Sequence, residues 1–329
     1  MAYLSDLRKI LGSTYDFGTN DTIVGTANGD TINVYGGSDL VVAGAGNDYI
    51  FDVRAYNGGN SGNDWILAGN GDDTIVSSLD SVNTYEGGDG TDTLNLIPNT
   101  NGVFVDLATG VARDRATLKQ STISTFENVT GSGQTDYLYG NAGANRLVGY
   151  NGDDLIRGQD GIDTLYGDRG QDVLFGGNQN DTVYGGEGND MLYGDNGGDM
   201  LFGEAGTDYL IGGAGRDYLS GGTGADTFKF NVVTESGTTG ATADMIADFV
   251  HLSDKINVAD IDARATAAGN QAFTFIGNNN FSAAGQIRYV LDAGSQDTVI
   301  LFNTDNDAAA EMVIKIDPLV ALSAGDFIL

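Results

Sequence analysis

The feature that most constrains this chain is a nine-residue repeat, which runs through residues 131–229 without insertion or deletion. Each of the eleven nonamers begins with Gly, and the eighth residue of each is apolar. The sixth residue is Asp in every nonamer except the second, where it is Asn145. A fixed short period dictates how successive segments can pack, so the fold must be built from this unit.

Each nonamer combines a turn with a short strand. The first six residues are rich in Gly, which adopts the left-handed conformations of tight turns. The last three form a strand whose side chains alternate between faces, so the uniformly apolar eighth residue points inward. Two nonamers then make one flattened coil, and successive coils stack about 4.8 Å apart. The repeat therefore predicts an all-β fold, a parallel β-roll or β-helix solenoid.

The sixth residues form a column of carboxylates along each edge of such a solenoid, and this column would repel itself without a cation. Ca²⁺ takes about 6–8 oxygen ligands from carboxylates and backbone carbonyls, and a Gly-rich turn with one Asp supplies both, whereas Mg²⁺ demands strict octahedral geometry. The predicted calcium ligands of this array are Asp136, Asp154, Asp163, Asp172, Asp181, Asp190, Asp199, Asp208, Asp217 and Asp226.

Three nonamers, residues 185–193, 212–220 and 221–229, match the pattern G-G-x-G-x-D-x-U-x at every specified position. In this respect the array resembles the RTX (repeats-in-toxin) haemolysin-type family, whose calcium-binding repeat has that pattern. The resemblance implies a calcium-binding parallel β-roll and multiple Ca²⁺ ions as the cofactor.

Residues 16–95 contain a second, degenerate array. Its sixth-position residues are Asp21, Asp30, Asp39, Asp48, Asp64, Asp73 and Asp92, and an apolar residue follows each two places later: Ile23, Ile32, Val41, Ile50, Ile66, Ile75 and Leu94. The early turns lack the glycines of the regular array. The predicted calcium ligands here are therefore Asp39, Asp48, Asp64 and Asp73.

The remaining segments complete five predicted parts. Residues 1–15 are an N-terminal cap, since a solenoid needs its open ends covered. Residues 96–130 are a β spacer that continues the solenoid as wider coils. We expect strands over residues 103–107 and 122–129 there, with a polar loop over residues 113–119. The five parts are 1–15, the degenerate array 16–95, the spacer 96–130, the regular array 131–229 and a C-terminal β cap domain, 230–329.

The C-terminal cap resembles the C-terminal domain of serralysin-type proteases in residues 244–249, 273–277 and 285–289. Residues 326–329, an Asp before three apolar residues, resemble the uncleaved type I secretion signal of that family. The resemblance implies export by a type I secretion apparatus and an extracellular location, secreted or at the cell surface. Residues 303–307 stand where the family often has a fuller Asp- and Gly-rich loop.

The acidic composition agrees with the binding of many calcium ions. The formal net charge is −31, close to what calcium at the sixth-position aspartates would balance. The 15 Lys and Arg residues are scattered, which argues against nucleic acid as a partner, and there is no Cys to form disulfides. Residues 1–8 lack the apolar core of a secretory signal. No apolar run approaches the roughly 20 residues of a transmembrane segment.

No catalytic motif is evident. A zinc protease needs His-Glu-x-x-His, and the single histidine, His251, has no sequence partner of that kind. Gly-x-Ser-x-Gly is also absent. Trp65 faces outward, for packing or for stacking on a sugar. We therefore expect no enzyme but an extracellular calcium-binding protein of a surface layer, matrix or adhesive structure, which could self-assemble.

Two alternatives remain open: an RTX-linked polysaccharide-modifying enzyme (a β-helix epimerase or lyase), and a small RTX effector acting on host membranes. The 80 irregular N-terminal residues are too few for a catalytic β-helix. An apolar strip on the outward face, from Val173 to Ile211, bears on self-assembly. We expect the cap or a second protomer to bury its members Phe175, Met191, Tyr193 and Tyr209, while Thr164, Thr182 and Ser220 stay exposed.

Overall fold

The structure is a computed structural model that describes residues 7–9, 20–34, 36–53, 62–264, 269–305, 307 and 309–329. It divides into two compact units, unit 1 (Met1–Gly158) and unit 2 (Gln159–Leu329). Within the described residues the regular structure is all strand apart from the 3-10 turn η1 (Ala324–Asp326), which confirms the all-β class. Except for β1, the predicted cap 1–15 lies outside the described residues.

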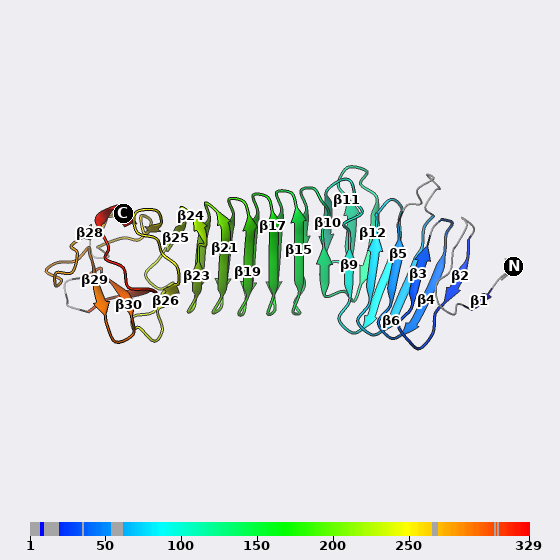
Figure 1. The fold of residues 1–329 in the computed structure, drawn as a ribbon, viewed down its shortest axis with the longest axis horizontal. Coiled ribbons are helices and arrows are strands. Elements are labelled where there is room, and N and C mark those ends of the chain that lie inside the picture. The colour runs from blue at the N-terminus through cyan, green and yellow to red at the C-terminus, as the bar shows by residue number, and fades with distance from the viewer. Residues whose placement is uncertain are drawn as a thin grey trace. The chain divides into compact units, whose positions relative to one another are not determined.

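Unit 1 winds its chain alternately between two parallel sheets, as a β-roll does (Figure 1). One sheet contains β1 (Leu7–Lys9), β2 (Thr22–Val24), β4 (Leu40–Ala45), β6 (Trp65–Asn70) and β8 (Thr84–Asp89). The other contains β3 (Thr31–Val34), β5 (Tyr49–Asp52), β7 (Thr74–Ser77), β9 (Thr93–Asn95), β13 (Asn128–Thr130) and β15 (Arg146–Asn151).

The spacer continues the first sheet through a short meander and not through wider coils. Strand β12 (Gln120–Ser124) pairs in parallel with β8, and β11 (Val111–Asp114) runs antiparallel to both β12 and β10 (Val103–Asp106). Strand β10 pairs in parallel with β14 (Tyr137–Tyr139), which pairs with β16 (Leu155–Asp160). The loop predicted over residues 113–119 is wrong at its start, because β11 includes Arg113 and Asp114.

Unit 2 has the same alternation (Figure 1). One sheet contains the parallel strands β18 (Val173–Asn178), β20 (Met191–Asn196), β22 (Tyr209–Ala214), β25 (Thr227–Lys229), β27 (Lys255–Asn257) and β32 (Phe327–Ile328). The other contains β17 (Thr164–Arg169), β19 (Thr182–Glu187), β21 (Met200–Gly206), β23 (Tyr218–Ser220), β26 (Asp244–Ile246) and β31 (Met312–Ile316).

The residues after 229 therefore extend both sheets of unit 2. Antiparallel β30 (Asp297–Asn303) follows β31, and β29 (Gln286–Asp292) and β28 (Thr274–Phe275) complete that sheet, while β24 (Thr223–Gly224) pairs with β21. No helix in the described part of the chain is long and apolar enough to cross a membrane.

Columns of inward apolar residues form the core, as the repeat predicts. In unit 2 the register aligns Leu174, Leu192, Leu210 and Phe228, and each is fully buried. In unit 1 it aligns Ile32, Ile50, Ile75 and Leu94 in the same way. Burying one such side chain stabilises the fold by about 1.5–3 kcal/mol, so each coil adds a similar increment.

The outward faces differ from the expectation. Aromatic rings stack along both faces of unit 2, with centroids 4.5 Å apart for Phe175 and Tyr193 and 4.9 Å apart for Tyr166 and Tyr184. The predicted burial of the strip is wrong for Met191, which is 38% exposed. The other named residues of both faces are half-buried alike: Phe175, Tyr193, Tyr209, Thr164, Thr182 and Ser220. Burial therefore does not distinguish the two faces.

One group of inward residues in unit 1 is polar, and we call it the Asp52 cluster: Asp52, Ser77, Asn83 and Tyr85. Tyr85 takes the inward place of β8, and its hydroxyl donates to Asp52 Oδ2 and lies 2.7 Å from Ser77 Oγ. Asn83 Nδ2 also donates to Asp52 Oδ2, at 2.6 Å. The sequence pattern of nonamers does not reveal this cluster, because it brings together residues of different coils.

The Asp52 cluster should make the stability of unit 1 depend on pH. Burial is the largest of the causes that raise the pKa of Asp52 to about 8; the charges of Asp64, Asp80 and Asp39 also raise it, and the hydrogen bond from Tyr85 lowers it. In the unfolded chain the value is near about 4. Between these values only the folded state holds the proton, so the contribution of Asp52 to the free energy of unfolding falls as pH rises from about 4 to about 8.

We expect Asp52→Asn to gain stability relative to the parent protein between pH 5 and pH 9, measured by denaturant unfolding at saturating calcium. The exposed neighbour Glu86→Gln is the control and should show no such trend. An equal difference between Asp52→Asn and the parent at every pH would contradict the assignment.

Candidate metal centres

The sixth-position residues form a hydrogen-bonded ladder in each unit. Oδ1 of each aspartate accepts a bond from the backbone N–H of the sixth-position residue one coil earlier, and we call this series the carboxylate ladder. The bonds measure 2.7–2.9 Å and join Asp39 to Asp64, Asp48 to Asp73, Asp73 to Asp92, Asp136 to Asp154, Asp163 to Asp181, Asp172 to Asp190, Asp181 to Asp199, Asp190 to Asp208, Asp199 to Asp217 and Asp208 to Asp226.

All the predicted ligands are buried, with at most 4% of any of them exposed: Asp39, Asp48, Asp64, Asp73, Asp136, Asp154, Asp163, Asp172, Asp181, Asp190, Asp199, Asp208, Asp217 and Asp226. Burial, with a smaller contribution from neighbouring carboxylates, raises the pKa of Asp199 to about 8 and that of Asp208 to about 7. Burial of an ionised carboxylate in this position costs free energy, so a proton or a cation must neutralise its charge.

The second carboxylate oxygen points to a cation. Oδ2 is buried without a hydrogen-bond partner in Asp48, Asp73, Asp181, Asp190, Asp199, Asp208 and Asp217. A buried oxygen without a donor costs free energy, which coordination of a hard cation would recover. These residues therefore have the chemistry that a calcium ion requires.

The backbone of these turns has a regular conformation. The second and fourth residues of these turns are left-handed, with φ of 112° at Gly186 and 152° at Gly188. We call such a turn open. The first glycine has a different role: a Cβ on Gly194 would lie 2.4 Å from Asp199 Oδ2 and 2.4 Å from the carbonyl oxygen of Gly212. Carboxylate and carbonyl oxygens thus converge where only glycine fits.

The turn before Asp136 has a different geometry. Asp136 Oδ2 accepts from Ser132 N at 2.5 Å, and Oδ1 accepts from Val103 N at 2.7 Å. Neither the second nor the fourth residue, Ser132 or Gln134, is left-handed. We call this turn closed, because hydrogen bonds already satisfy both oxygens. This geometry does not favour Asp136 as a calcium ligand, although the sequence groups it with the others.

The sequence places Asp92 at a sixth position without naming it as a calcium ligand, and it does not reveal Asp244 as a ladder residue. Asp92 ends an open turn, with φ of 119° at Gly88 and 144° at Gly90, and residues 87–92 match the G-G-x-G-x-D pattern. Asp244 accepts from Asp217 N at 2.8 Å, is fully buried and has Oδ2 without a partner. The available signal was the triplet of Asp, any residue and an apolar residue at 244–246. The ladder therefore continues beyond the last nonamer.

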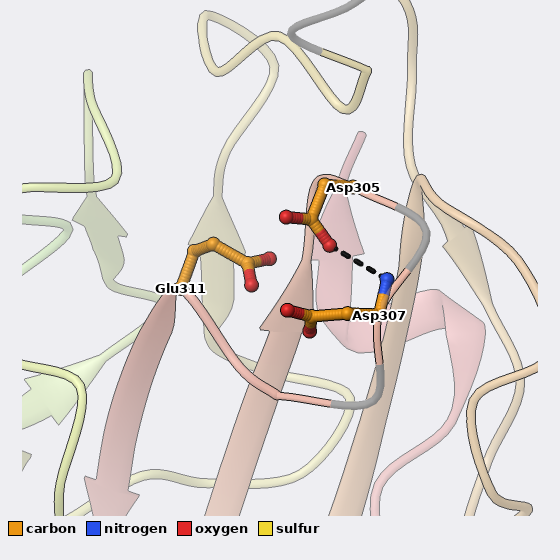
Figure 2. A group of neighbouring side chains, drawn as sticks. All are labelled: Asp305, Asp307 and Glu311. Carbon is orange, nitrogen blue, oxygen red and sulfur yellow. Dashed lines mark hydrogen bonds between the residues drawn. The ribbon is translucent and has the colours of Figure 1, made fainter.

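A separate acidic group lies in the loop after β30, where the sequence left metal binding open. Asp305, Asp307 and Glu311 direct carboxylate oxygens toward one another, all within 4.8 Å (Figure 2). Asp305 Oδ1 accepts from Asp307 N at 2.8 Å, and Glu311 Oε2 accepts from Thr304 N at 2.5 Å. Hydrogen bonds within the loop account for this arrangement.

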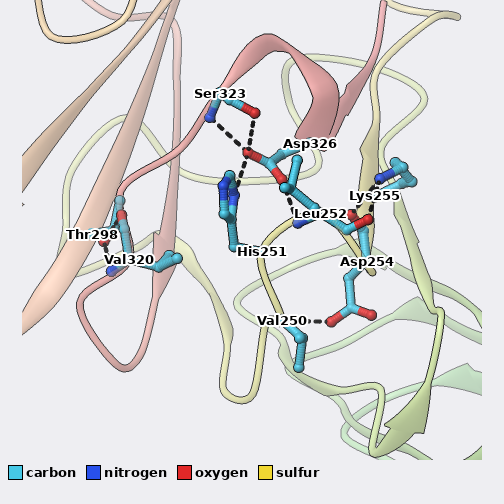
Figure 3. A network of polar contacts seen from close by, with 9 residues as sticks. All are labelled: Val250, His251, Leu252, Asp254, Lys255, Thr298, Val320, Ser323 and Asp326. Atoms are coloured by element: carbon cyan, nitrogen blue, oxygen red, sulfur yellow. Dashed lines mark hydrogen bonds and ion pairs between the residues drawn. The ribbon is translucent and has the colours of Figure 1, made fainter.

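His251 has a partner that the sequence did not suggest. Its Nδ1 lies 2.9 Å from Asp326 Oδ2, and the same oxygen accepts from Ser323 Oγ at 3.0 Å (Figure 3). Asp326 Oδ1 accepts from Leu252 N at 2.9 Å. Burial raises the pKa of Asp326, but these hydrogen bonds lower it more and hold it below its usual value. The network fastens β32 to the 250–254 turn.

Comparison with protein-family models identifies the repeat. The model described as the RTX calcium-binding nonapeptide repeat (4 copies) matches residues 15–50, 59–81, 130–165, 157–192 and 193–228. The fold and the turns define a calcium-binding β-roll. Within that class the chain contains RTX calcium-binding nonapeptide repeats, and such repeats bind multiple Ca²⁺ ions. The search of curated proteins finds no match.

Solved structures give weaker likenesses. The AlgE6R3 subunit of the Azotobacter vinelandii mannuronan C5-epimerase is 27% identical with a TM-score of 0.35, over 46% of this chain and 80% of that one. The AlgE6R2 subunit is 25% identical with a TM-score of 0.35, over 47% and 91%. Lipase LipA from Serratia marcescens is 16% identical with a TM-score of 0.31, over 95% and 40%. These TM-scores are too low to support a shared activity.

Gly194→Ala should disable one turn by steric conflict with Asp199 Oδ2. Overpacking of this kind costs about 1–3 kcal/mol, and calcium affinity at that turn should fall. The control is Gly133→Ala, where the nearest atom to the new Cβ is Asn151 Nδ2 at 4.0 Å. Calorimetric calcium titration of both variants checks the prediction. Equal titration curves would show that the first glycine is not required.

Proposed function

We propose that this is a secreted, non-catalytic calcium-binding protein, which folds when it meets calcium outside the cell and serves as a structural, surface-layer, matrix or adhesive component. The observation that carries the proposal is the series of buried ladder carboxylates with an unpartnered Oδ2. Without cations, the burial of these carboxylates costs free energy. With cations bound, the same series stabilises the roll along its length. Calcium then takes the place of the disulfides that a chain without Cys cannot form.

The geometry around His251 supports a structural role over a catalytic one. In a hydrolytic triad the nucleophile bonds to the histidine, and the carboxylate bonds to the other ring nitrogen. Here Ser323 and His251 both bond to the same oxygen of Asp326, so the serine is not activated (Figure 3). Self-association remains a prediction, for which the half-exposed aromatic rings of unit 2 offer a surface.

Calcium should drive folding of the open turns. With a chelator the ladder carboxylates repel one another and the Gly-rich turns lose their ligands, so metal binding and folding are coupled. Circular dichroism of the purified full chain should lose most of its strand signal in chelator and recover it in millimolar calcium. A strand-rich spectrum that chelator leaves unchanged would contradict the proposal.

Export should depend on residues 326–329. Asp326 is fully buried, and Phe327 pairs with Ile256 in β27, so an export receptor could read this segment only before unit 2 folds. Deleting residues 326–329 should retain the protein inside the cell, measured by immunoblot of cells and medium. Because the deletion also removes a structural contact, Ser323→Ala is the control: it weakens the same network but keeps the segment, and it should still be exported. Retention of both variants would assign the effect to folding.

A further inference from the structure

Three turns of unit 1 have a side-chain N–H donor beside the sixth-position residue, and the first is at Asn83. Asn83 occupies the ladder, since its Oδ1 accepts from Asp64 N at 2.9 Å. Its Nδ2 donates to Asp52 Oδ2 at 2.6 Å and lies 2.5 Å from the Tyr85 hydroxyl. The amide oxygen of Asn83 thus accepts the ladder bond, while its NH2 group donates to neighbouring oxygens.

The second turn is the closed turn at Asp136, which has a cation of its own. The Arg115 guanidinium stacks on the Tyr137 ring, 3.9 Å from its centroid, and Nη1 donates to the backbone carbonyl of Thr135, the residue before Asp136. Burial raises the pKa of Asp136 to about 6, and the Arg115 charge opposes that rise. The guanidinium therefore bonds a carbonyl of this turn and its charge acts on the Asp136 carboxylate.

The third turn is at Asn145, the one nonamer of the regular array without an aspartate. Asn145 Oδ1 accepts from Asn141 N at 2.8 Å, which closes the turn. Its Nδ2 donates to the carbonyl oxygen of Glu127 at 2.9 Å, one coil away. The neutral amide connects two coils with hydrogen bonds and brings no charge that needs neutralisation.

The repeat turns of unit 2 have the opposite character, as do the turns at Asp48, Asp73 and Asp92 in unit 1. At Asp181, Asp190, Asp199, Asp208 and Asp217 the carboxylate ends an open turn, and its Oδ2 is buried without a partner. Equivalent places of the roll are thus stabilised by different means. Within residues 77–150, Asn83, Arg115 and Asn145 supply N–H donors, whereas the open turns, including the one at Asp92, require an ion.

We propose that residues 77–150 form a calcium-independent folding nucleus, in which the side-chain N–H groups of Asn83, Arg115 and Asn145 take the place of bound calcium. The nucleus would keep part of unit 1 folded when calcium is scarce, and the open turns would fold onto it as calcium rises. This inference rests on the calcium-driven folding proposed above, and it names the segment that folds without calcium.

Hydrogen exchange of the full chain, followed by mass spectrometry in excess chelator and in calcium, tests the nucleus. In chelator, amides of residues 77–150 should exchange about tenfold or more slowly than those of residues 159–229. Rapid exchange in both segments would overturn the nucleus and leave calcium-driven folding standing. Protection of both segments would refute calcium-driven folding and, with it, the contrast between units.

Three variants, two at Arg115 and one at Arg113, test the role of the guanidinium. Arg115→Met should lose the protection of residues 131–139 in chelator, and Arg115→Lys should restore part of it because the charge returns. Arg113→Met is the matched control: Arg113 also stacks on an aromatic ring, 4.4 Å from the Phe104 centroid, but lies beside no sixth-position residue. If Arg113→Met and Arg115→Met reduce the protection of residues 131–139 equally, stacking on an aromatic ring accounts for that protection. Replacement of calcium by the guanidinium is then not needed, and the proposal fails.

Discussion

The structure depends on one bond, from the backbone N–H of each sixth-position residue to the carboxylate Oδ1 of the next coil. The bond fixes the register of adjacent coils at their edges, while the inward apolar residue two places later fixes it in the core. It also buries a charged group and uses one of its two oxygens. The other oxygen creates the need for metal, so the interaction that orders the roll is also the one that makes it depend on calcium.

The repeat predicted most of the fold and most of the ladder. Leu174 and Leu192 are buried because the eighth position faces inward, and Asp190 and Asp208 lie in one ladder because two nonamers make a coil. These outcomes follow from a period that is visible in the sequence. The same rule identifies Asp92 as a sixth-position residue, and it could have identified Asp244, since each precedes an apolar residue by two places.

Other features could not be predicted, because they depend on contacts without a period. Arg115 lies in a spacer that looks like a polar loop, yet its position directly after β11 brings it to the carbonyl of Thr135, 20 positions away. Tyr85 reaches Asp52 from another coil across 33 positions. A pattern identifies what every repeat shares, whereas these side chains distinguish one coil from the next.

The pairing of each strand with the strand two nonamers away has a consequence for how such a chain can change length. Gaining or losing a single nonamer would move every later strand of the array to the opposite sheet and every later aspartate to the opposite edge. Residues 230–329 join their sheets at fixed strands, Lys255–Asn257 onto Thr227–Lys229 and Asp244–Ile246 onto Tyr218–Ser220. Duplication or deletion of 18 residues preserves both junctions. The array is therefore expected to change length by whole coils, and a change of nine residues should be selected against.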